Sequence, residues 1–452
     1  MAGASSKTAR LPFVAVLFLI LLACVLLAPS AAQAQTLTVL YTFTGEHSQD
    51  GAHPMSGVVM DRAGNLYGAT FEGGANGDPG QACSTINDNG GCGTIFKLTK
   101  HGSSRTYSQL YKFQAAPDGN FPNGVVIGPD GTLYGTTLGG GFGEEDCDNF
   151  WHGCGIAFRL RPQPNICPSI NCPWIESVLH TFHGENGDGA SPNNGDLIFD
   201  LAGNIYGTTE MGGPTNYGTV YELTPSQGGW TESIIFNFDP ANQNIGYPDS
   251  GLIRDQAGNY YGASDYNYVE NNPSGGLYQL VPSQSGWTLN ALQVFQCVGG
   301  LNGCFPETPI SDGQGNLVTT MTGAGFFGEG TAIKLVASDN WSIDLLYTFQ
   351  HGQGGPSGPL TMDAAGNLYG VAFTCALPAG NGCIYKLTPS SGSYTFTDLY
   401  DFTNGPDGRN PSGRVMIDAN GNLYGTAENA GNNNRCLGEG QSGCGTVWEF
   451  TP

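Results

Sequence analysis

Short runs in which apolar and polar residues alternate recur along this chain, separated by Gly, Asn, Asp and Pro. One phrase occurs in seven variants between residues 56 and 452. It is an apolar run, then Asp-x-x-Gly-Asn-Leu-Tyr-Gly-Thr, a Gly-rich stretch, and Gly-Thr-Val-Phe-x-Leu-Thr. Its Gly-Asn-Leu-Tyr core, which varies in places, begins at Gly64, Gly131, Gly203, Gly258, Gly315, Gly366 and Gly421. Each unit offers four short runs rich in Val, Tyr, Thr and Phe, which are typical of strands joined by hairpins.

The spacing of the repeat predicts the architecture. Successive cores are 67, 72, 55, 57, 51 and 55 residues apart, which is too long for one coil of a solenoid and suits a propeller blade. In the first repeat the expected strands are Ser56–Met60, Asn65–Thr70, Thr94–Thr99 and Thr106–Phe113. We therefore predict an all-β fold, a seven-bladed β-propeller of four-stranded blades, as a single domain over residues 35–452.

The two ends of the repeat region predict how the ring closes. Residues 36–43 resemble the fourth run of every repeat, whereas the chain ends on Thr446–Thr451, a third run. The first strand of the chain is therefore expected to complete the last blade, which leaves no unpaired edge in the ring.

A ring of aspartates opens the turn between the first and second strands of the repeats. These residues are Asp61, Asp200, Asp255, Asp312, Asp363 and Asp418, while the second repeat has Gly128 at this place and Asp130 two residues later. Asp accepts hydrogen bonds from backbone amides two residues on, and Gly supplies a positive φ, so the pattern favours a tight hairpin turn. A metal-binding or catalytic role for these carboxylates is the alternative.

The N-terminus predicts export. Lys7 and Arg10 precede the apolar run Leu11–Ala28, and Ala32-Gln33-Ala34 is typical of a cleavage site, so residues 1–34 are expected to be a secretory signal peptide. Because Leu21-Leu22-Ala23-Cys24 resembles a lipobox, a lipoprotein anchored through Cys24 is the alternative to free secretion. No later segment is apolar over enough residues to span a bilayer. We expect a secreted or cell-surface protein, in the extracellular space or the periplasm.

The net charge of the chain limits the kinds of partner that it can bind. Without residues 1–34 the chain carries 13 basic and 38 acidic residues, a net charge of −25. Such a surface repels nucleic acid and anionic lipid. Charged residues make up only 12% of the chain and Gly numbers 71, so neutral polar groups and turns must cover most of the surface. A monomer that meets a glycan or a protein at the cell surface is the expectation.

The cysteines fall into close pairs. Apart from Cys24, the twelve cysteines form six pairs, each bracketing a short loop within one repeat: Cys83/Cys92, Cys147/Cys154, Cys167/Cys172, Cys297/Cys304, Cys375/Cys383 and Cys436/Cys444. An even number in an exported chain favours disulfides. Zinc binding is the alternative, but it needs four ligands at one point, which pairs dispersed over different blades do not readily supply.

Three long insertions between second and third strands mark one face. Phe71–Gly93, Leu138–Gly155 and Glu428–Gly445 come from the first, second and last blades, which ring closure makes neighbours. The second insertion concentrates carboxylates, aromatic rings and an imidazole, which suit a sugar because rings stack and carboxylates accept hydrogen bonds. The candidate ligand-binding residues are Glu144, Glu145, Asp146, Phe150, Trp151 and His152. The alternative is that the two aromatic residues only cover a disulfide and the blade edge.

Other candidate chemistry is weaker. Asp-Gly-x-x-Pro-x-x-Gly recurs with small variations between repeats, as at Asp50–Gly57 and Asp188–Gly195, but no loop has the several carboxylates of a calcium site, so the motif favours turn formation. Gly323-Ala-Gly-Phe-Phe-Gly precedes a predicted strand instead of the helix that a dinucleotide site needs. We identify no catalytic, cofactor-binding or metal-binding residues and expect no cofactor. Paired carboxylates from different blades would leave no local motif, so glycoside cleavage stays open.

The repeats resemble a known family. Asp200-Leu-Ala-Gly-Asn-Ile-Tyr-Gly-Thr, followed by Tyr217-Gly-Thr-Val-Tyr-Glu-Leu-Thr-Pro, looks like the GloVer tandem repeat of bacterial exported "choice-of-anchor" proteins. The resemblance covers nearly the whole chain after residue 34, and the fifth repeat departs from it most, with Leu317-Val-Thr-Thr in place of Leu-Tyr-Gly-Thr. It implies an exported, propeller-like repeat protein and carries no activity with it.

Two classes of function follow. The first is an exported, non-catalytic binding or scaffold propeller that recognises a glycan or a protein partner. The second is an extracellular propeller enzyme that degrades polysaccharide as a glycosidase or a lyase. The regular repeats and the lack of catalytic motifs favour the first.

Overall fold

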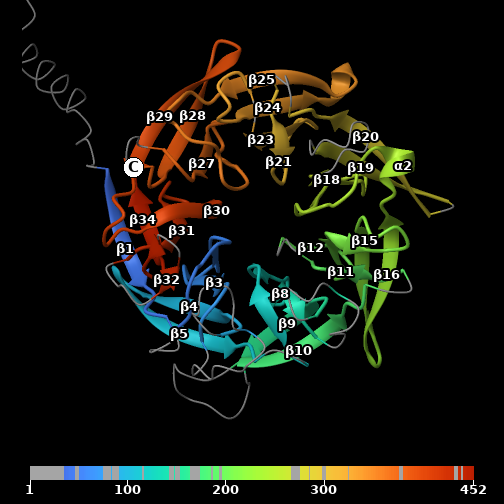
Figure 1. The fold of residues 1–452 in the computed structure, drawn as a ribbon, viewed down its shortest axis with the longest axis horizontal. Coiled ribbons are helices and arrows are strands. Elements are labelled where there is room, and N and C mark those ends of the chain that lie inside the picture. The colour runs from blue at the N-terminus through green and yellow to red at the C-terminus, as the bar shows by residue number, and fades with distance from the viewer. Residues whose placement is uncertain are drawn as a thin grey trace, which may run out of the picture.

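Seven β-sheets are arranged around a central axis like the blades of a propeller (Figure 1). The structure is a computed structural model that describes residues 35–45, 50–74, 83, 91–114, 117–141, 147, 153–162, 174–184, 187–192, 196–265, 275–284, 286–297, 302–323, 325–375, 380–431, 436–438 and 441–452. The all-β, seven-bladed prediction is confirmed. Within the described residues the regular helical elements are α2 (Pro240–Gln243) and a 3-10 turn (Ala337–Asp339).

Each blade is an antiparallel sheet, and in blades 1 to 6 the strands run in sequence order from the axis outward. Blade 1 contains β2 (Val59–Met60), β3 (Leu66–Thr70), β4 (Thr94–His101) and β5 (Ser104–Lys112). Blade 2 contains β6 (Gly119–Pro122), β7 (Val126–Ile127), β8 (Leu133–Gly140), β9 (Ile156–Pro162) and β10 (Trp174–Thr181). Blade 3 contains β12 (Ile198–Phe199), β13 (Ile205–Thr209), β15 (Thr219–Ser226) and β16 (Gly229–Asn237), with the ribbon β11 (Gly189–Ala190) and β14 (Met211–Gly212) beside it.

Blades 4 to 6 follow the same order, whereas blade 7 ends on β1 as its outermost strand. Blade 4 contains β17 (Ile253–Arg254), β18 (Tyr260–Ser264), β19 (Gly276–Ser283) and β20 (Gly286–Val294). Blade 5 contains β21 (Cys304–Pro306), β22 (Ile310–Ser311), β23 (Leu317–Gly323), β24 (Thr331–Val336) and β25 (Ser342–Thr348). Blade 6 contains β26 (Thr361–Met362), β27 (Leu368–Ala372), β28 (Cys383–Ser390) and β29 (Ser393–Asp401). Blade 7 contains β30 (Arg409–Ile417), β31 (Leu423–Asn429), β34 (Thr446–Thr451) and β1 (Thr36–Thr42), with the ribbon β32 (Leu437–Gly438) and β33 (Gln441–Ser442).

The N-terminal strand closes the ring as predicted. β1 pairs antiparallel with β34 in a register that joins Thr36 to Thr451 and Thr42 to Thr446, and it is the outermost strand of blade 7. In Figure 1 this strand, in blue, lies against the red strands of the chain's other end. The last blade therefore has the same four strands as the others.

The hydrophobic core lies between the blades. Buried apolar side chains form seven clusters, and each joins the facing sides of two neighbouring blades. The cluster that closes the ring, for example, packs Val447 and Tyr424 of blade 7 against Leu66 and Phe96 of blade 1. Because every interface is apolar on both sides, each blade is stabilised by two neighbours.

The repeated aspartates form turns, as expected. Asp61 Oδ1 accepts hydrogen bonds from the backbone amides of Ala63 and Asn65, both at 2.9 Å. Its Oδ2 accepts from the Asn65 side chain at 2.8 Å and from the Tyr67 hydroxyl at 3.0 Å. The same four bonds recur at Asp200, Asp363 and Asp418. Each carboxylate thus lies in its own hairpin, and the Asn and Tyr of the motif are its hydrogen-bond donors.

One contact recurs at all seven blade junctions. The glycine before each third strand has φ between +75° and +95°, and a Cβ on it would approach Cδ of a proline in the loop that follows that blade. The pairs are Gly93/Pro122, Gly155/Pro192, Gly218/Pro248, Gly275/Pro306, Gly330/Pro356, Gly382/Pro411 and Gly445/Pro54. These positions need Gly for its backbone conformation and for space. They hold each inter-blade loop against the preceding blade.

Candidate functional site

The predicted ligand-binding residues Glu144, Glu145, Asp146, Phe150, Trp151 and His152 all lie outside the described residues. The ends of their insertion are described. Cys147 is disulfide-bonded to Cys154, and Gly141 N donates a hydrogen bond to the carbonyl of Asp118 at 2.8 Å. The insertion is therefore tied at its base to the loop between blades 1 and 2, and its role in binding stays a prediction.

Five of the six predicted disulfides are present: Cys83–Cys92, Cys147–Cys154, Cys297–Cys304, Cys375–Cys383 and Cys436–Cys444. Cys167 and Cys172 lie outside the described residues. Disulfides at this density indicate an extracellular or periplasmic protein, because cytosolic thiols are kept reduced. In the part of the chain that the structure describes, no helix is long and apolar enough to cross a membrane.

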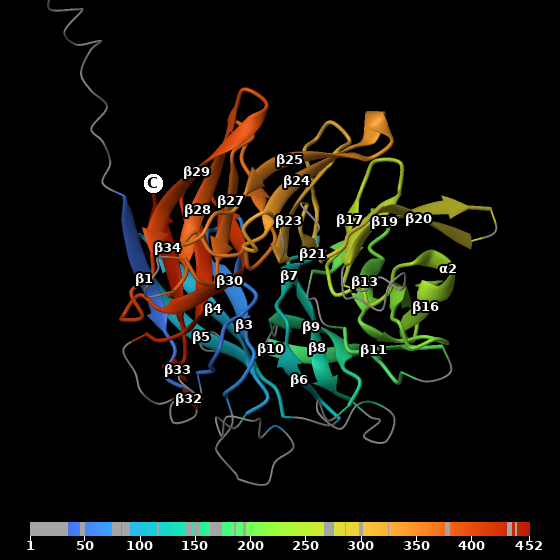
Figure 2. The same ribbon diagram turned by 45° about the horizontal axis from the view of Figure 1, so that its top comes forward.

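The long insertions and the inter-blade loops share one face of the ring. Figure 2 shows β32 and β33, which belong to the last insertion, on the same lower side as β6, which belongs to an inter-blade loop. The backbone amides of His53 and Phe121, in two inter-blade loops, donate hydrogen bonds to the carbonyls of Cys444 and Cys92, which end two of the insertions. Disulfide-closed insertions and junction loops therefore form one connected surface.

A cavity of about 280 Å³ opens at the axis of the propeller. Most of its lining residues either follow a junction proline or begin a long insertion, which places the cavity toward the insertion face. It is lined by Met55, Ser56, Phe71, Pro122, Asn123, Asp196, Glu307, Ser357, Gly358, Pro359, Ser412, Gly413 and Arg414. Six of the seven blades contribute. The volume is just below the lower end of the usual range for ligand pockets, roughly 300–1,000 Å³.

The walls of the cavity differ in chemistry. Blades 6, 7 and 1 meet backbone to backbone, because a Cβ on Gly358 would lie 2.5 Å from the Gly413 carbonyl oxygen and one on Gly413 would lie 2.6 Å from Gly57 N. This wall offers Ser412, whose Oγ is buried and has no hydrogen-bond partner among the described residues. The other wall, the acidic wall, carries the carboxyl groups of Asp196 from blade 3 and Glu307 from blade 5.

One ion pair crosses the axis. Arg414 Nη2 of blade 7 lies 3.1 Å from Asp196 Oδ2, which precedes the inner strand of blade 3, and Arg414 Nη1 donates to the Leu360 carbonyl at 3.0 Å. Both charged side chains remain about one-third exposed. The pair therefore presents a fixed cation and a fixed anion to anything that enters the cavity.

Burial and neighbouring carboxyl groups raise the pKa of Glu307 and of a carboxyl group near it. Burial, and then the charge of Asp265, raise the pKa of Glu307 to about 7, although the Arg414 charge opposes the shift. Burial also raises the pKa of Asp249 well above its usual value, with further contributions from Asp265, Glu307 and Glu210. A carboxyl with a pKa near 7 can donate or accept a proton at neutral pH.

The aspartates of the inter-blade motif brace the junctions. Asp50, Asp118 and Asp407 each accept a hydrogen bond from a tyrosine near the end of the preceding outer strand, and the same carboxylates accept from backbone amides of the loop. This arrangement agrees with the turn-forming role expected from the sequence.

Sequence reasoning missed Asp196, Glu307, Ser412 and Arg414. They lie at the start of inner strands, where the repeats differ from one another, so no motif marks them. A usable signal was present, because the junction proline is constant while the residue after it varies: it is Met55, Asn123, Asn193, Asp249, Glu307, Ser357 or Ser412. Positions that vary among otherwise uniform repeats indicate a specialised surface.

The fold and the axial cavity define a seven-bladed β-propeller with a small polar pocket at its centre. The model of the Gloeobacter/Verrucomicrobia repeat matches residues 149–374 and 305–452, so the chain belongs to that repeat family. No curated protein matches.

Solved structures share the fold at low sequence identity. A polysaccharide lyase of family 25, an ulvan lyase, matches with a TM-score of 0.52 at 11% identity, over 86% of this chain and 93% of the lyase. The extracellular domain of a B. thetaiotaomicron protein, described as a one component system, matches with a TM-score of 0.48 at 12% identity over 92% of this chain. This chain spans only 40% of that structure's length. A protein from Lactobacillus plantarum matches with a TM-score of 0.45 at 12% identity, over 79% of this chain and 95% of that one.

Proposed function

We propose that this protein is an exported, non-catalytic β-propeller that binds a neutral glycan through the axial cavity and the insertion face around it. The observation that carries the proposal is the contrast within the ring. Residues that hold the blades together repeat seven times, whereas those that line the cavity differ from blade to blade. Variation concentrated in loops on a rigid scaffold is typical of a binding surface.

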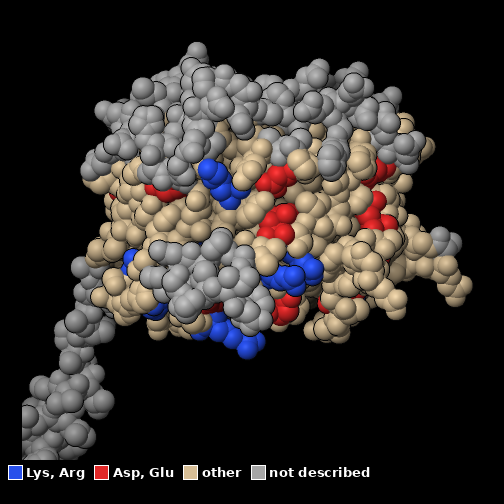
Figure 3. Space-filling model, turned by 90° about the horizontal axis from the view of Figure 1, so that it is seen from below, with Lys and Arg blue, Asp and Glu red and all other residues tan. Residues whose placement is uncertain are grey.

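The lining chemistry supports a sugar ligand. Phe71 supplies an apolar ring, Ser412 a hydroxyl without a partner, and the Asp196–Arg414 pair supplies an acceptor and a donor. Sugars combine apolar C–H faces with hydroxyls that both donate and accept hydrogen bonds, so they match such a mixture. The net charge of the chain disfavours a polyanion, and uncharged residues cover most of the described surface on the side that Figure 3 shows. The cavity volume suits the terminal units of a glycan.

Binding is tested by screening the chain from residue 35 to 452 on an array of neutral and acidic glycans. The variants Phe71→Ala and Ser412→Ala should each weaken binding of the selected glycan, by about 3- to 10-fold for a lost aromatic contact or hydrogen bond. Asp344→Asn, on the exposed outer strand β25, is the control and should bind like the wild type. If both cavity variants bind the neutral glycan as tightly as the wild type does, the axial site is contradicted.

A variant of Trp151 tests the long insertions separately from the cavity. If the insertion Leu138–Gly155 takes part in binding, Trp151→Ala should weaken binding by about 1–2 kcal/mol without altering thermal stability, because the residue lies outside the repeat pattern. Unchanged affinity in Trp151→Ala together with a loss in Phe71→Ala would restrict the site to the cavity.

An enzyme that degrades polysaccharide is the second candidate. Glu307 favours it, because its pKa of about 7 and its place beside Asp196 and Arg414 suit proton transfer. This candidate predicts release of reducing or unsaturated sugars from polysaccharide incubated with the protein, and loss of that release in Glu307→Gln. Binding without release would leave the non-catalytic proposal standing.

A further inference from the structure

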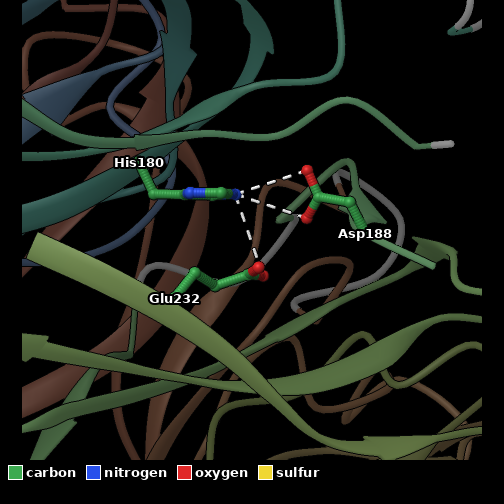
Figure 4. A group of neighbouring side chains, drawn as sticks. All are labelled: His180, Asp188 and Glu232. Atoms are coloured by element: carbon green, nitrogen blue, oxygen red, sulfur yellow. Dashed lines mark hydrogen bonds and ion pairs between the residues drawn. The ribbon is translucent and has the colours of Figure 1, made fainter. Parts of the chain in front are cut away.

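Three ligand-type side chains converge between blades 2 and 3, away from the axial cavity. His180 lies near the end of β10, the outer strand of blade 2. Asp188 precedes β11 in the junction loop, and Glu232 comes from the outer strand β16 of blade 3 (Figure 4). His180 Nε2 lies 3.3 Å from both oxygens of Asp188 and 3.8 Å from Glu232 Oε1. All three side chains are largely buried, with 14–20% of each exposed.

The two His180–Asp188 separations match those of a metal's ligand atoms, and the His180–Glu232 separation is slightly longer. Zinc binds imidazole nitrogen and carboxylate oxygen at about 2.0–2.2 Å, so ligand atoms on a tetrahedron around it lie roughly 3.3–3.6 Å apart. The imidazole and one oxygen of each carboxylate lie within 4.8 Å of one another. Zinc binding would need the Glu232 side chain to move closer to His180 Nε2.

One carboxyl oxygen of the cluster is open to a cation. Glu232 Oε1 is buried and accepts no hydrogen bond from any described residue. A buried charge without a partner is unfavourable. A divalent ion would bind Glu232 Oε1 and balance the negative charge of the carboxylates.

At other junctions of the same ring a tyrosine occupies the position of His180. Between blades 1 and 2, Tyr111 stands where His180 stands, and its hydroxyl donates to Asp118 at 2.9 Å. Glu176 lies close enough to both that their charges interact, as Glu232 does in the next junction. Tyr also occupies this position at Tyr41 and Tyr400, each bonded to the junction aspartate. His180 is therefore not required by the fold, and it replaces a hydroxyl with a nitrogen that can bind a metal.

We propose that His180, Asp188 and Glu232 bind one divalent transition-metal ion of the zinc class and so crosslink blades 2 and 3. Three protein ligands leave one position for water, and part of each side chain is exposed, so the ion can enter from solvent. A mixed imidazole and carboxylate set suits zinc better than calcium, which takes six to eight oxygen ligands.

The test is zinc titration by calorimetry of the chain from residue 35 to 452 after treatment with a chelator, combined with thermal unfolding. The wild type should bind one equivalent of Zn²⁺. Its melting temperature should rise by about 2–4 °C when free Zn²⁺ reaches a hundred times the Kd. Absence of stoichiometric binding, or one equivalent of Ca²⁺ bound in preference to Zn²⁺, would overturn the proposal.

His180→Tyr is the matched variant, because it installs the side chain that other junctions use. It should fold and melt like the metal-free wild type, bind no Zn²⁺ at this site and show no rise in melting temperature. Glu232→Gln is a second variant that keeps the size of the side chain, and it should bind Zn²⁺ at least tenfold more weakly. Wild-type affinity in either folded variant would contradict the assigned ligands.

Discussion

Thr319 lies directly opposite Ile333 across the second and third strands of blade 5, whereas the other six blades pair a glycine with an aromatic ring at this position. Those pairs are Gly68/Phe96, Gly135/Phe158, Gly207/Tyr221, Gly262/Tyr278, Gly370/Tyr385 and Gly425/Trp448. A Cβ on Gly68 would lie only 2.5 Å from Phe96 Cζ, so the ring needs the glycine. In blade 5 the Ile333 side chain is smaller than an aromatic ring, so it leaves room for Thr319.

The pairing predicts a strong coupling in blade 4. Gly262→Thr alone should destabilise the protein by about 1–3 kcal/mol, because the added side chain meets the Tyr278 ring. Tyr278→Ile alone should also destabilise it, because Tyr278 is fully buried and a cavity would remain. The double variant reproduces blade 5 and should be more stable than the sum of the two changes, by about 0.5–3 kcal/mol. A double-mutant cycle by urea unfolding measures this, and additive effects would argue against the pairing.

The sequence predicted the fold well because its information is repeated. The number of blades, the closing strand and the turn at Asp61 each follow from a pattern that occurs many times, so local exceptions matter little. The predicted inner strand of blade 1, Ser56–Met60, is too long, because regular pairing covers only Val59 and Met60. Near the axis the chain from Ser56 to Val58 packs against the neighbouring blades instead, as the bridge between Gly57 and Arg414 shows.

Removing residues 36–43 should expose the edge of β34. The deletion removes Phe43 from the cluster between blades 7 and 1, as well as all pairing of β1. We expect aggregation or a large fall in melting temperature, measured by light scattering and circular dichroism. A control that deletes residue 35 alone should behave like the wild type. A truncated chain that melts normally would contradict closure through β1.

The disulfides should each contribute measurably to stability. Cys83 and Cys92 close a loop of nine residues, so replacing both with serine should lower the free energy of unfolding by about 2–3 kcal/mol. Peptide mapping without reduction should find six local bridges, including Cys167–Cys172, and thiol titration should find no free cysteine. A crosslink from Cys83 to another repeat, or several free thiols, would show that pairing by proximity fails.

The candidate site was less predictable than the fold. Arg414 and Asp196 are 218 residues apart, and only ring closure brings their side chains within 3.1 Å. His180 carries no motif either, and it becomes notable only when aligned with Tyr111 in the repeat. Sites assembled from several blades leave single, unrepeated residues in the sequence, so a search for local motifs passes over them.

Acidification should stabilise the protein between pH 8 and pH 5. Burial raises the pKa of Glu307 to about 7, so the folded chain binds a proton there that the unfolded chain releases above its usual pKa of about 4.5. The contribution is fully present below pH 4.5 and is lost as the pH rises through 7. At lower pH the hairpin aspartates reverse the trend. Hydrogen bonds at Asp61 outweigh its burial and lower its pKa, so its contribution is lost as the pH falls below about 4.

Glu307→Gln isolates the axial part of this dependence. The amide cannot ionise, so the variant should gain about 1–3 kcal/mol over the wild type at pH 8 and little at pH 5, which corresponds to about 1–3 °C in melting temperature. Asp344→Asn, whose carboxylate is exposed, controls for the loss of one charge and should keep the wild-type slope. Melting curves recorded from pH 5 to pH 8 compare the three proteins. A Glu307→Gln profile parallel to that of the wild type would show that the carboxyl titrates normally and that the acidic wall does not hold a proton at neutral pH.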